Sequence, residues 1–342
     1  MKILITGGAG FIGCNAAARA LAAGHEVVVL DDLSRGGASR NLDWLRSRGD
    51  FDFRKIDIRA FPDLLELFQE QDFDAVYHLA AQVAVTTSVT DPRTDFEINA
   101  LGTFNLLEAA RLTGQRGAFV FSSTNKVYGN LDDLKVEEDE KRYCLASGAG
   151  VSEQQPLDFH SPYGCSKGSA DQYVRDYHRI YGLKTVVMRQ SCIYGPRQFG
   201  IEDQGWVAWF IIAVLTGRPL TVYGDGKQVR DILCVDDLLD CFELVVENID
   251  RCAGQAFNVG GGPVNAVSLL EFLDLLQGKL GRRINYGFSD WRPGDQKIYV
   301  SDISKAKKVL GWRPRVSPAE GIEELVAFVK ENKAEIVEIL GD

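Results

Sequence analysis

The chain has 342 residues, of which 45% are hydrophobic and 25% are charged. This composition is ordinary for a globular protein and excludes a wholly disordered, collagen-like or coiled-coil chain. The length predicts two domains, or one domain with an inserted lobe. Lysine and arginine number 38 against 48 aspartates and glutamates, and the net charge of −10 disfavours nucleic acid as a partner. A small anionic ligand remains compatible with this charge.

Cysteine and histidine usage bears on compartment and metals. The seven cysteines are odd in number and contain no C-x-x-C pair, which predicts reduced thiols and a cytoplasmic location. The four histidines lack metal-ligand spacing, so we expect no metal site. The longest apolar run, 206–215, is too short to span a bilayer, so it predicts a buried helix and no membrane partner.

Strand-like and helix-like segments alternate through the first half of the chain. The predicted strands are 2–6, 26–30, 75–79, 118–121 and 185–188, and the predicted helices are 11–23, 61–69, 94–111 and 163–181. Short strands alternating with helices indicate right-handed βαβ crossovers. We therefore predict an α/β fold with a doubly wound parallel sheet of the Rossmann type.

The regular order breaks after residue 189, where Gly, Pro and Trp become more frequent. We predict a dinucleotide-binding domain over 1–189 that also carries the catalytic residues. A smaller C-terminal α/β lobe over 190–342 would bind substrate, with segments able to return to the sheet. The charge run 135–142, KVEEDEKR, is typical of a solvated loop without a specific role.

A glycine-rich segment, TGGAGFIG at 6–13, follows a predicted strand and opens a predicted helix. Gly7, Gly10 and Gly13 would allow a tight turn, a close approach to a pyrophosphate and close helix–strand packing. The helix N-terminus would offer free amides to the phosphates. Asp31, eighteen residues after Gly13, can accept hydrogen bonds from both ribose hydroxyls, which favours NAD over NADP. Arg35 could instead bind a 2′-phosphate, which would favour NADP. The alternative is a glycine-rich turn without a ligand.

Two further positions fit a dinucleotide site less specifically. Asp57 and Ile58 end another strand-like run and could contact the adenine, although a strand-ending acid explains Asp57 equally simply. Asn99 is a weak helix former inside the predicted helix 94–111. It could organise a proton relay or be purely structural.

Tyr163 and Lys167 are four residues apart in a predicted helix, so their side chains share a face. A neighbouring ammonium and a positive nicotinamide ring would both favour the phenolate. A pKa three units lower corresponds to about 4 kcal/mol of differential stabilisation. Such a phenolate could take a proton from an alcohol while a hydride leaves the same carbon. The alternative is an amphipathic surface helix.

The triplet Ser122-Ser123-Thr124 follows a predicted strand, at the sheet edge where open parallel sheets bind ligands. Thr124 could hydrogen-bond the reacting oxygen. A polar loop is the alternative.

Five strings together resemble one enzyme family: TGGAGFIG, LAAQ (79–82), SSTNKVYG (122–129), SPYGCSK (161–167) and IYGPRQ (193–198). They are similar to the extended short-chain dehydrogenase/reductase family of nucleotide-sugar enzymes. The longer strings LDFHSPYGCSKG (157–168), RQFGIEDQGWVAWF (197–210) and GKQVRDIL (226–233) are most similar to its branch that inverts C2 in CDP-paratose and CDP-tyvelose. The resemblance implies an NAD-dependent epimerase with a CDP-hexose substrate. It also implies a homo-oligomer paired through helices 94–111 and 163–181.

The resemblance also implies roles for individual residues. Thr124, Tyr163 and Lys167 would be the catalytic set, and Arg230, Arg292 and Asp295 would hold the nucleotide diphosphate and ribose. Implied cofactor contacts are Gly7, Gly10, Phe11, Ile12, Gly13, Asp31, Asp32, Ser34, Arg35, Asp57, Ile58, Leu79, Ala80, Ala81, Gln82, Asn99, Ser122, Tyr163 and Lys167. Implied substrate contacts are Thr124, Asn125, Lys126, His160, Cys192, Gln198, Gln204, Gly205, Val207, Tyr223, Gln228, Arg230, Arg292 and Asp295.

Two departures from the family pattern bear on the reaction. Cys192 stands where R-x-x-N-x-Y-G-P has asparagine, which puts that amide contact to the diphosphate in doubt. The dehydratases carry an Asp-Glu pair after the threonine, whereas this chain has Asn125-Lys126, which disfavours elimination of water.

The expected reaction is transient oxidation at C2 of the hexose, rotation of the keto-sugar and re-reduction from the other face. A net dehydrogenase using Cys165 or Cys192 stays open, although packing explains both cysteines. A UDP-sugar 4-epimerase would share every catalytic residue, and a non-catalytic NAD-binding protein is the third alternative.

Overall fold

The computed structural model describes residues 1–292 and 294–341, so Pro293 of the RPGD string and Asp342 lie outside the described residues. The chain forms two compact units, each assembled from three segments. The first unit comprises Met1–Val127, Phe159–Arg189 and Leu239–Phe257. The second comprises Tyr128–Asp158, Gln190–Leu238 and Asn258–Asp342. The functional division at residue 189 stays a prediction, and the chain enters the second unit well before it, at Tyr128.

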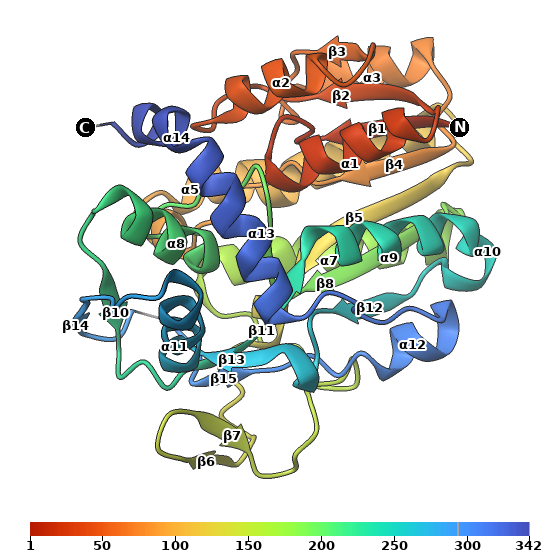
Figure 1. Ribbon diagram of the computed structural model, residues 1–342. Coiled ribbons are helices and arrows are strands. Elements are labelled where there is room, and N and C mark those ends of the chain that lie inside the picture. Colours follow the sequence, from red (N-terminus) through yellow and green to blue (C-terminus); the bar gives the residue numbers. More distant parts are fainter. Residues whose placement is uncertain (293, 342) are drawn as a thin grey trace. The chain divides into compact units, whose positions relative to one another are not determined.

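A seven-stranded sheet organises the first unit, with strand order β12-β8-β5-β4-β1-β2-β3 (Figure 1). The strands are β1 (Lys2–Thr6), β2 (Glu26–Leu30), β3 (Asp52–Arg54), β4 (Ala75–His78), β5 (Ala118–Thr124), β8 (Thr185–Gln190) and β12 (Ala256–Val259). The pairs β1–β2, β1–β4, β2–β3 and β4–β5 are all parallel. The predicted Rossmann-type sheet is confirmed, and the strand order reverses beside β1, where such sheets bind ligands.

The helices of this unit cover a core of aliphatic and aromatic side chains. They are α1 (Phe11–Ala22), α2 (Ala38–Arg46), α3 (Phe61–Glu70), α4 (Val85–Thr90), α5 (Pro92–Phe96), α6 (Gly102–Leu112), α7 (Ser161–Tyr181), α10 (Ile249–Cys252) and α9 (Val235–Glu247), which enters this unit at Leu239. Leu4, Leu106, Phe121 and Val187 are fully buried, so the core joins the sheet to its helices. Burial of this apolar area, at about 25 cal/mol per Å², drives the packing.

The predicted helix 94–111 is wrong as a single α-helix. A π-helical segment, Glu97–Leu101, separates α5 from α6. Close packing accompanies this change, because a Cβ on Gly102 would lie 2.5 Å from the Ile58 side chain. Single π turns of this kind occur frequently at functional sites.

The second unit is built from short strands around a helical core. Its strands include β9 (Cys192–Tyr194), β10 (Thr221–Tyr223), β11 (Val229–Cys234), β13 (Ala266–Ser268), β14 (Gly287–Ser289) and β15 (Ile298–Tyr299). Its helices are α8 (Trp206–Thr216), α11 (Leu269–Leu280), α12 (Ser304–Leu310), α13 (Pro318–Glu331) and α14 (Lys333–Leu340). The predicted buried helix at 206–215 is confirmed as α8, whose middle residues lie in the core of this unit.

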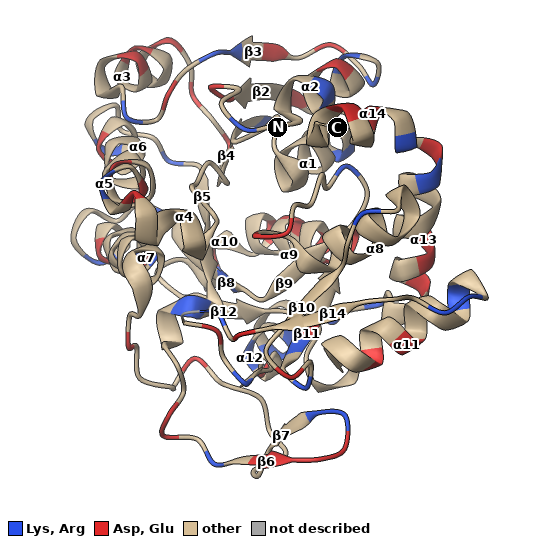
Figure 2. Ribbon diagram, turned by 90° about the vertical axis from the view of Figure 1, so that its left-hand side faces the viewer, with Lys and Arg blue, Asp and Glu red and all other residues tan. Residues whose placement is uncertain are grey.

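The charge run 135–142 is not the featureless loop that the sequence predicts. Its residues Val136–Glu138 form β6, which pairs antiparallel with β7 (Tyr143–Leu145). Lys227 donates to Glu138 at 2.7 Å, and the hydroxyl of buried Tyr143 donates to Asp225. Figure 2 shows the acidic residues concentrated on β6. The charges are solvated, as expected, but apolar Val136 and Tyr143 anchor the hairpin.

Among residues 1–292 and 294–341, no helix combines the length and apolar character that a bilayer crossing requires. All seven cysteines are free thiols.

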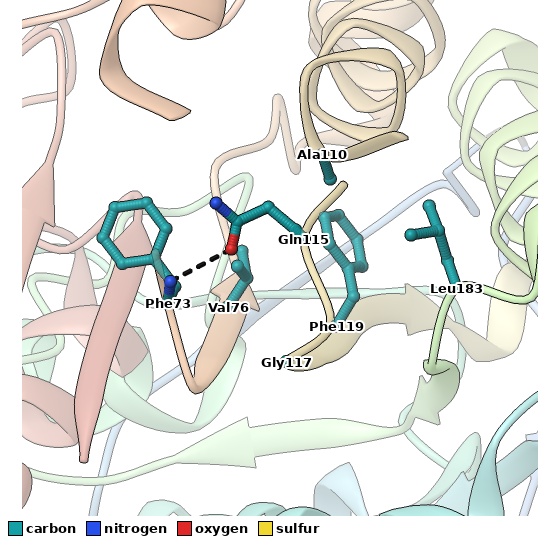
Figure 3. A pocket seen from close by; sticks show the side chains of 7 residues that line it. All are labelled: Phe73, Val76, Ala110, Gln115, Gly117, Phe119 and Leu183. Atoms are coloured by element: carbon teal, nitrogen blue, oxygen red, sulfur yellow. Dashed lines mark hydrogen bonds between the residues drawn. The ribbon is translucent and has the colours of Figure 1, made fainter. Parts of the chain in front are cut away.

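A small apolar cavity lies at the amino end of strands β4 and β5, at the sheet edge opposite the glycine-rich turn. Phe73, Val76, Phe119 and Leu183 contribute to its lining, and the Gln115 amide oxygen accepts from the Phe73 amide at 3.0 Å (Figure 3). The cavity is therefore a packing feature of the core.

A buried ion pair joins α7 to β8 in the first unit. Arg189 donates twice to the Asp171 carboxylate, at 2.9 Å each, and the Ser123 hydroxyl donates to the same carboxylate at 2.8 Å. Both charged side chains are almost completely buried. Removing one member of such a pair leaves an uncompensated charge in the core.

We therefore expect Asp171→Asn to lower the free energy of unfolding by about 3–5 kcal/mol, as measured by urea denaturation. Asp176→Asn, which breaks an exposed ion pair on the same helix, is the matched control and should cost at most about 1 kcal/mol. Equal losses in the two variants would contradict a special role for the buried pair.

Candidate active site

The glycine-rich turn connects β1 to α1 with very little space around it. Gly7 has a φ of +67°, and a Cβ there would lie 2.7 Å from the Ala80 amide nitrogen. A Cβ on Gly13 would overlap the Gly7 carbonyl. Gly10 is the N-cap of α1, so the first-turn amides of Phe11 and Ile12 have no acceptor within the helix.

Asp31 directly follows β2, and its side chain contacts the glycine-rich turn. Its carboxylate accepts from the Ala9 amide at 3.0 Å and from the Leu33 amide at 2.8 Å. Burial raises the pKa of this carboxyl. The Gly10 amide also contacts this carboxylate. A carboxylate has about four lone-pair sites, so acceptor capacity remains for a ribose hydroxyl.

These features test whether a dinucleotide fits. A pyrophosphate requires N–H donors and space beside the backbone, which the first-turn amides of α1 and the glycines without a Cβ provide. A ribose requires an acceptor for its hydroxyls, which the Asp31 carboxylate provides. The residues therefore fit NAD.

The remaining predicted cofactor contacts surround this turn or lie near it. Asp32 accepts from the Ser34 hydroxyl at 2.7 Å, and Arg35 is exposed beside them. Asp57 is engaged by Arg59, whose hydrogen bonds lower the pKa of the Asp57 carboxyl. Ile58 is buried in the core, so only its backbone remains for an adenine contact.

The segment Leu79–Gln82 follows β4 directly. The Thr6 hydroxyl oxygen accepts from the amides of Leu79 and Ala80 at 3.2 and 3.3 Å. This fixes the Leu79–Ala80 backbone against Gly7. Ala81 and Gln82 continue from there and are half-buried.

The predicted catalytic residues come together in the first unit. Thr124 ends β5, and Tyr163 and Lys167 lie in the first two turns of α7. The Tyr163 amide donates to the Ser88 hydroxyl at 3.1 Å, and the Tyr163 phenol shares a hydrogen bond with the Thr124 hydroxyl. All three side chains are buried.

Burial dominates the electrostatics of the two ionisable residues. Desolvation raises the pKa of Tyr163 to about 12, although the hydrogen bond to Thr124 lowers it in part. Desolvation lowers the pKa of Lys167 to about 7, with Asp171 and Asp95 opposing the shift. The expectation that the lysine ammonium would depress the phenol is therefore not met by the protein's own groups.

Lys167 is held by two neighbours on β5. Its ammonium donates to the Ser122 carbonyl at 2.6 Å and lies 4.3 Å from the centre of the Phe121 ring. Ser122, predicted as a cofactor contact, thus positions the lysine through its backbone. A ring face favours the charged form of an amine and so opposes part of the desolvation.

Asn99 lies in the π-helical segment and organises a buried polar network. Its amide oxygen accepts from the Gln82 backbone at 3.0 Å, and its amide nitrogen donates to Asp95 at 3.0 Å and to Ser166 at 3.2 Å. The Ser166 hydroxyl donates to Asp95 at 2.5 Å. The network ties the Gln82 segment to α7, which favours the structural interpretation of Asn99.

Several predicted substrate residues flank Thr124 and Tyr163 in the first unit. The Asn125 amide oxygen accepts from the Thr124 hydroxyl at 3.3 Å, and the Lys126 amide donates to the Thr124 hydroxyl at 3.2 Å. His160 is the half-buried N-cap of α7. Cys165 is exposed, and its thiol donates to the Phe159 carbonyl.

The predicted diphosphate residues lie in the second unit and already have acidic partners. The buried Arg230 guanidinium donates to Asp295 at 2.6 Å. Arg292 lies 3.1 Å from the Asp203 carboxylate and 3.9 Å from the centre of the Tyr223 ring. A diphosphate would therefore have to compete with carboxylates for both guanidinium groups.

Two glutamines of this unit present buried acceptors. The amide nitrogen of Gln198 donates to the Ile193 carbonyl at 3.3 Å, and that of Gln228 donates to the Tyr223 carbonyl at 2.5 Å. Within the described part of the chain, the oxygens of both amides have no hydrogen-bond partner. Such atoms in a native fold indicate a ligand or water contact.

The other predicted substrate residues are near Gln198. Gly205, with a φ of +80°, is the N-cap of α8, and a Cβ there would lie 3.0 Å from the Gln198 amide nitrogen. Gln204 pairs its backbone with Ile201. Val207 is buried in the core of the unit, and its role as a substrate contact stays a prediction.

Cys192, which stands where the family pattern has asparagine, accepts a hydrogen bond from a tryptophan. The Trp206 indole N–H donates to the Cys192 sulfur at 3.4 Å. This contact joins β9 to the first residue of α8 and gives Cys192 a structural explanation.

Sequence reasoning missed Ser88, Asp95, Ser166 and Asp171. The last three were accessible from the sequence, because Ser166 precedes Lys167 and Asp171 lies one helical turn beyond it, whereas Asp95 lies one turn before Asn99. Ser88 carries no such signal, since only the fold brings it to Tyr163.

Cys234, Asp236 and Glu324 place one potential ligand atom each within 4.8 Å of one another. Burial raises the pKa of the Cys234 thiol to about 12. Because a metal binds the thiolate, this environment opposes metal binding.

Comparisons with known proteins agree with the motifs. The family model described as GDP-mannose 4,6 dehydratase matches residues 4–325. The chain is 46% identical to the CDP-paratose 2-epimerase of Salmonella typhi over 331 residues, which is 95% of this chain and 98% of that protein.

Two solved structures are also similar. The UDP-glucose 4-epimerase of Thermotoga maritima, solved with UDP-glucose, has a TM-score of 0.86 at 32% identity and matches 97% of this chain and 100% of that one. The UDP-glucuronic acid 4-epimerase of Bacillus cereus, solved with UDP-glucuronic acid and NAD, has a TM-score of 0.83 at 32% identity, covering 97% and 99%. These matches confirm the predicted family resemblance.

The low pKa of Lys167 has a measurable consequence for stability. The unfolded chain keeps the lysine proton up to about pH 10.5, whereas the folded protein loses it near pH 7. The unfolded state therefore binds more protons in between, so stability rises with pH in this window. We expect the wild type to gain up to about 1.4 kcal/mol per pH unit above pH 7 relative to Lys167→Met, as measured by urea denaturation.

The control for this measurement is Lys330→Met, which removes an exposed lysine from α13 and should follow the wild type at every pH. Parallel curves for the wild type and Lys167→Met would show that Lys167 is not depressed.

Proposed function

The chain belongs to the GDP-mannose 4,6 dehydratase family, and from this premise we propose that it is an NAD-dependent nucleotide-sugar epimerase. Its reaction inverts C2 of the hexose in a CDP-sugar of the paratose and tyvelose type. The observation that carries the proposal is the identity of 46% to a CDP-paratose 2-epimerase over nearly the whole length of both chains. The buried Thr124–Tyr163–Lys167 set supports an enzyme rather than a pure NAD-binding protein.

The first unit carries the chemistry in this proposal. Gly7, Gly10, Phe11, Ile12 and Asp31 hold the dinucleotide. Bound NAD would supply the hydride acceptor and donor, together with a positively charged nicotinamide ring. The remaining steps belong to the residues of this chain.

Tyr163 is the base and acid of the reaction. It takes the proton of the sugar hydroxyl and later returns it, while the Thr124 hydroxyl holds the phenol in place. Because burial, opposed in part by the hydrogen bond to Thr124, raises the pKa of Tyr163 to about 12, the phenol of the free protein is protonated at neutral pH. Deprotonation therefore needs positive charge at the site beyond what a lysine with a pKa of about 7 supplies.

The second unit anchors the nucleotide. Arg230 and Arg292 bind the diphosphate, at about 1.5–3 kcal/mol for each charge-assisted contact. Inversion requires a firmly held diphosphate and a sugar free to turn about it. Two arginines at the diphosphate suit the first part of that requirement.

The residues after Thr124 argue against dehydration despite the name of the family. Asn125 and Lys126 offer neither a carboxylic acid to protonate a leaving hydroxyl nor a carboxylate to take a carbon-bound proton. A UDP-sugar 4-epimerase is the second candidate, favoured by the similar UDP-sugar epimerase structures. The identity of the base and of the inverted carbon separates the two.

Two finer parts of the proposal concern the cell and the assembly. A cytoplasmic location is supported by the free thiols and stays a prediction for cell fractionation to test.

We also propose a homodimer, which is supported by apolar side chains that are exposed on helices α5, α6 and α7. Phe96 is 55% exposed, Ile180 62% and Tyr181 52%.

The enzymatic proposal is tested by incubating the purified protein with NAD and CDP-paratose, and separately with UDP-glucose, and locating the inverted carbon by NMR. We expect inversion at C2 of the CDP-sugar, and we expect Tyr163→Phe to reduce kcat by about 10²–10⁴-fold while retaining NAD. Inversion at C4 of UDP-glucose would favour the second candidate, and an active Phe variant would overturn the role of Tyr163.

The homodimer is tested at the exposed aromatic contact of Phe104 with Tyr173, whose rings lie 5.7 Å apart. A double variant, Phe104→Glu with Tyr173→Glu, would place like charges in a two-fold interface, because the same patch of each copy forms such an interface. We expect the double variant to sediment as a monomer. Val264→Glu, which alters a 93% exposed apolar residue of the second unit, is the control and should leave the mass unchanged. A monomeric wild type would contradict the proposal.

A further inference from the structure

The turn that carries Gln198 has an unusual residue at its third position. The Gln198 amide donates to the Gly195 carbonyl, which closes a turn with Pro196 second and Arg197 third. Arg197 has a φ of +68°. Proline followed by a positive φ is the arrangement of a type II turn, where glycine or asparagine is usual. A non-glycine residue persists in this region only when its surroundings fix it.

Arg197 contacts one neighbour in its own loop and two residues in the C-terminal part of the chain. Its guanidinium lies 5.2 Å from the centre of the Phe199 ring and 5.6 Å from that of Phe328, in α13. It also lies 3.5 Å from the Glu335 carboxylate, in α14. The Arg197 side chain is only 6% exposed. Aromatic faces and a carboxylate together compensate a charge that is otherwise costly to bury.

Helix α14 is itself fixed to the second unit. Ile336 is fully buried, and Leu340 packs against the same core. Arg218, just after α8, donates to the Gly341 carbonyl at 2.6 Å. The ion pair therefore joins the Arg197 turn to a helix that is anchored at both ends.

The residue next to this turn presents a buried, unpaired acceptor. Gln198 is 4% exposed, and its amide nitrogen is committed to the Ile193 carbonyl. This contact fixes the orientation of the amide, because a flipped amide would place two oxygens together. Its oxygen therefore stays unpaired among the described residues. A buried acceptor of this kind is suited to an N–H or O–H donor of a ligand.

We propose that Gln198 accepts a hydrogen bond from the nucleotide sugar, and that Arg197 and Glu335 are positioning residues that aim it. The inference rests on the proposed function and extends it, since it makes the C-terminal helix α14 part of the substrate-binding apparatus. The donor is either an amine or hydroxyl of the nucleoside or a hydroxyl of the hexose. CDP alone contains the nucleoside donors but no hexose, so binding of CDP distinguishes the two sources.

Three variants test the proposal in the full-length protein. Gln198→Leu removes the acceptor at similar volume, and Glu335→Gln removes the charge that holds Arg197. Glu331→Gln removes an exposed charge at the end of α13 and is the matched control. For each we would measure kcat and KM for CDP-paratose, the Kd for CDP by calorimetry and the Tm.

We expect Gln198→Leu to raise KM about ten-fold, the effect of one hydrogen bond, with kcat within two-fold. Glu335→Gln should raise KM several-fold, and Glu331→Gln should match the wild type. Because Glu335 acts through Gln198, the double variant should have the KM of Gln198→Leu alone rather than the product of the two effects. A weaker Kd for CDP would assign the donor to the nucleoside, and an unchanged one to the hexose.

A lower Tm with unchanged KM in both single variants would overturn the inference, since it would show a structural role or a bound water. Multiplicative effects in the double variant would overturn the link through Gln198. If the wild type does not turn over CDP-paratose, the proposed function fails. The inference is then decided by the calorimetric Kd of CDP and CDP-paratose, and it fails as well if neither binds.

Discussion

The candidate site depends on one buried charge pair. Asp171 accepts from Arg189 and from Ser123, so a single carboxylate joins α7, β8 and β5. Lys167 lies one helical turn before Asp171, and Thr124 follows Ser123 directly. The ion pair therefore helps to hold the segments that carry Thr124, Tyr163 and Lys167, the residues of the proposed catalytic set. Arg189 is also the arginine of the R-x-x-N-x-Y-G-P string, and in this chain its side chain forms a buried ion pair with Asp171.

The same burial that fixes the geometry works against ionisation. Desolvation raises the pKa of Tyr163 and lowers that of Lys167, so both side chains are biased toward their neutral forms. The sequence pattern Y-x-x-x-K indicates proximity, but only the fold shows that desolvation is the largest cause of the pKa shift of each group.

The sequence predicted local structure where the physical signal is local. β1 and β2 have the predicted bounds, and α1 and α3 end within one residue of the prediction, because apolar periodicity and glycine placement determine them. The π segment at Glu97–Leu101 could not be predicted, since it depends on packing against Ile58 and on the contacts of Asn99. The alternation of chain segments over the two units is likewise a property of long-range contacts.

Prediction of the site follows the same division. Gly7, Asp31, Thr124, Tyr163 and Lys167 were accessible because their spacing follows from strand and helix geometry. The contact of Ser88 with Tyr163 and that of Glu335 with Arg197 join positions 75 and 138 residues apart, where no sequence period operates. Such contacts arise from tertiary structure alone, and they connect the candidate residues to the rest of the fold.

Backbone strain coincides with the candidate residues more than with the rest of the chain. Among the described residues, the non-glycine positions with a positive φ are Leu33, Leu131, Ser161 and Arg197. Leu33 follows Asp31 by two residues, Ser161 precedes Tyr163 by two, and Arg197 precedes Gln198. At these three positions the fold thus holds the backbone in an unfavourable conformation within two residues of a candidate side chain.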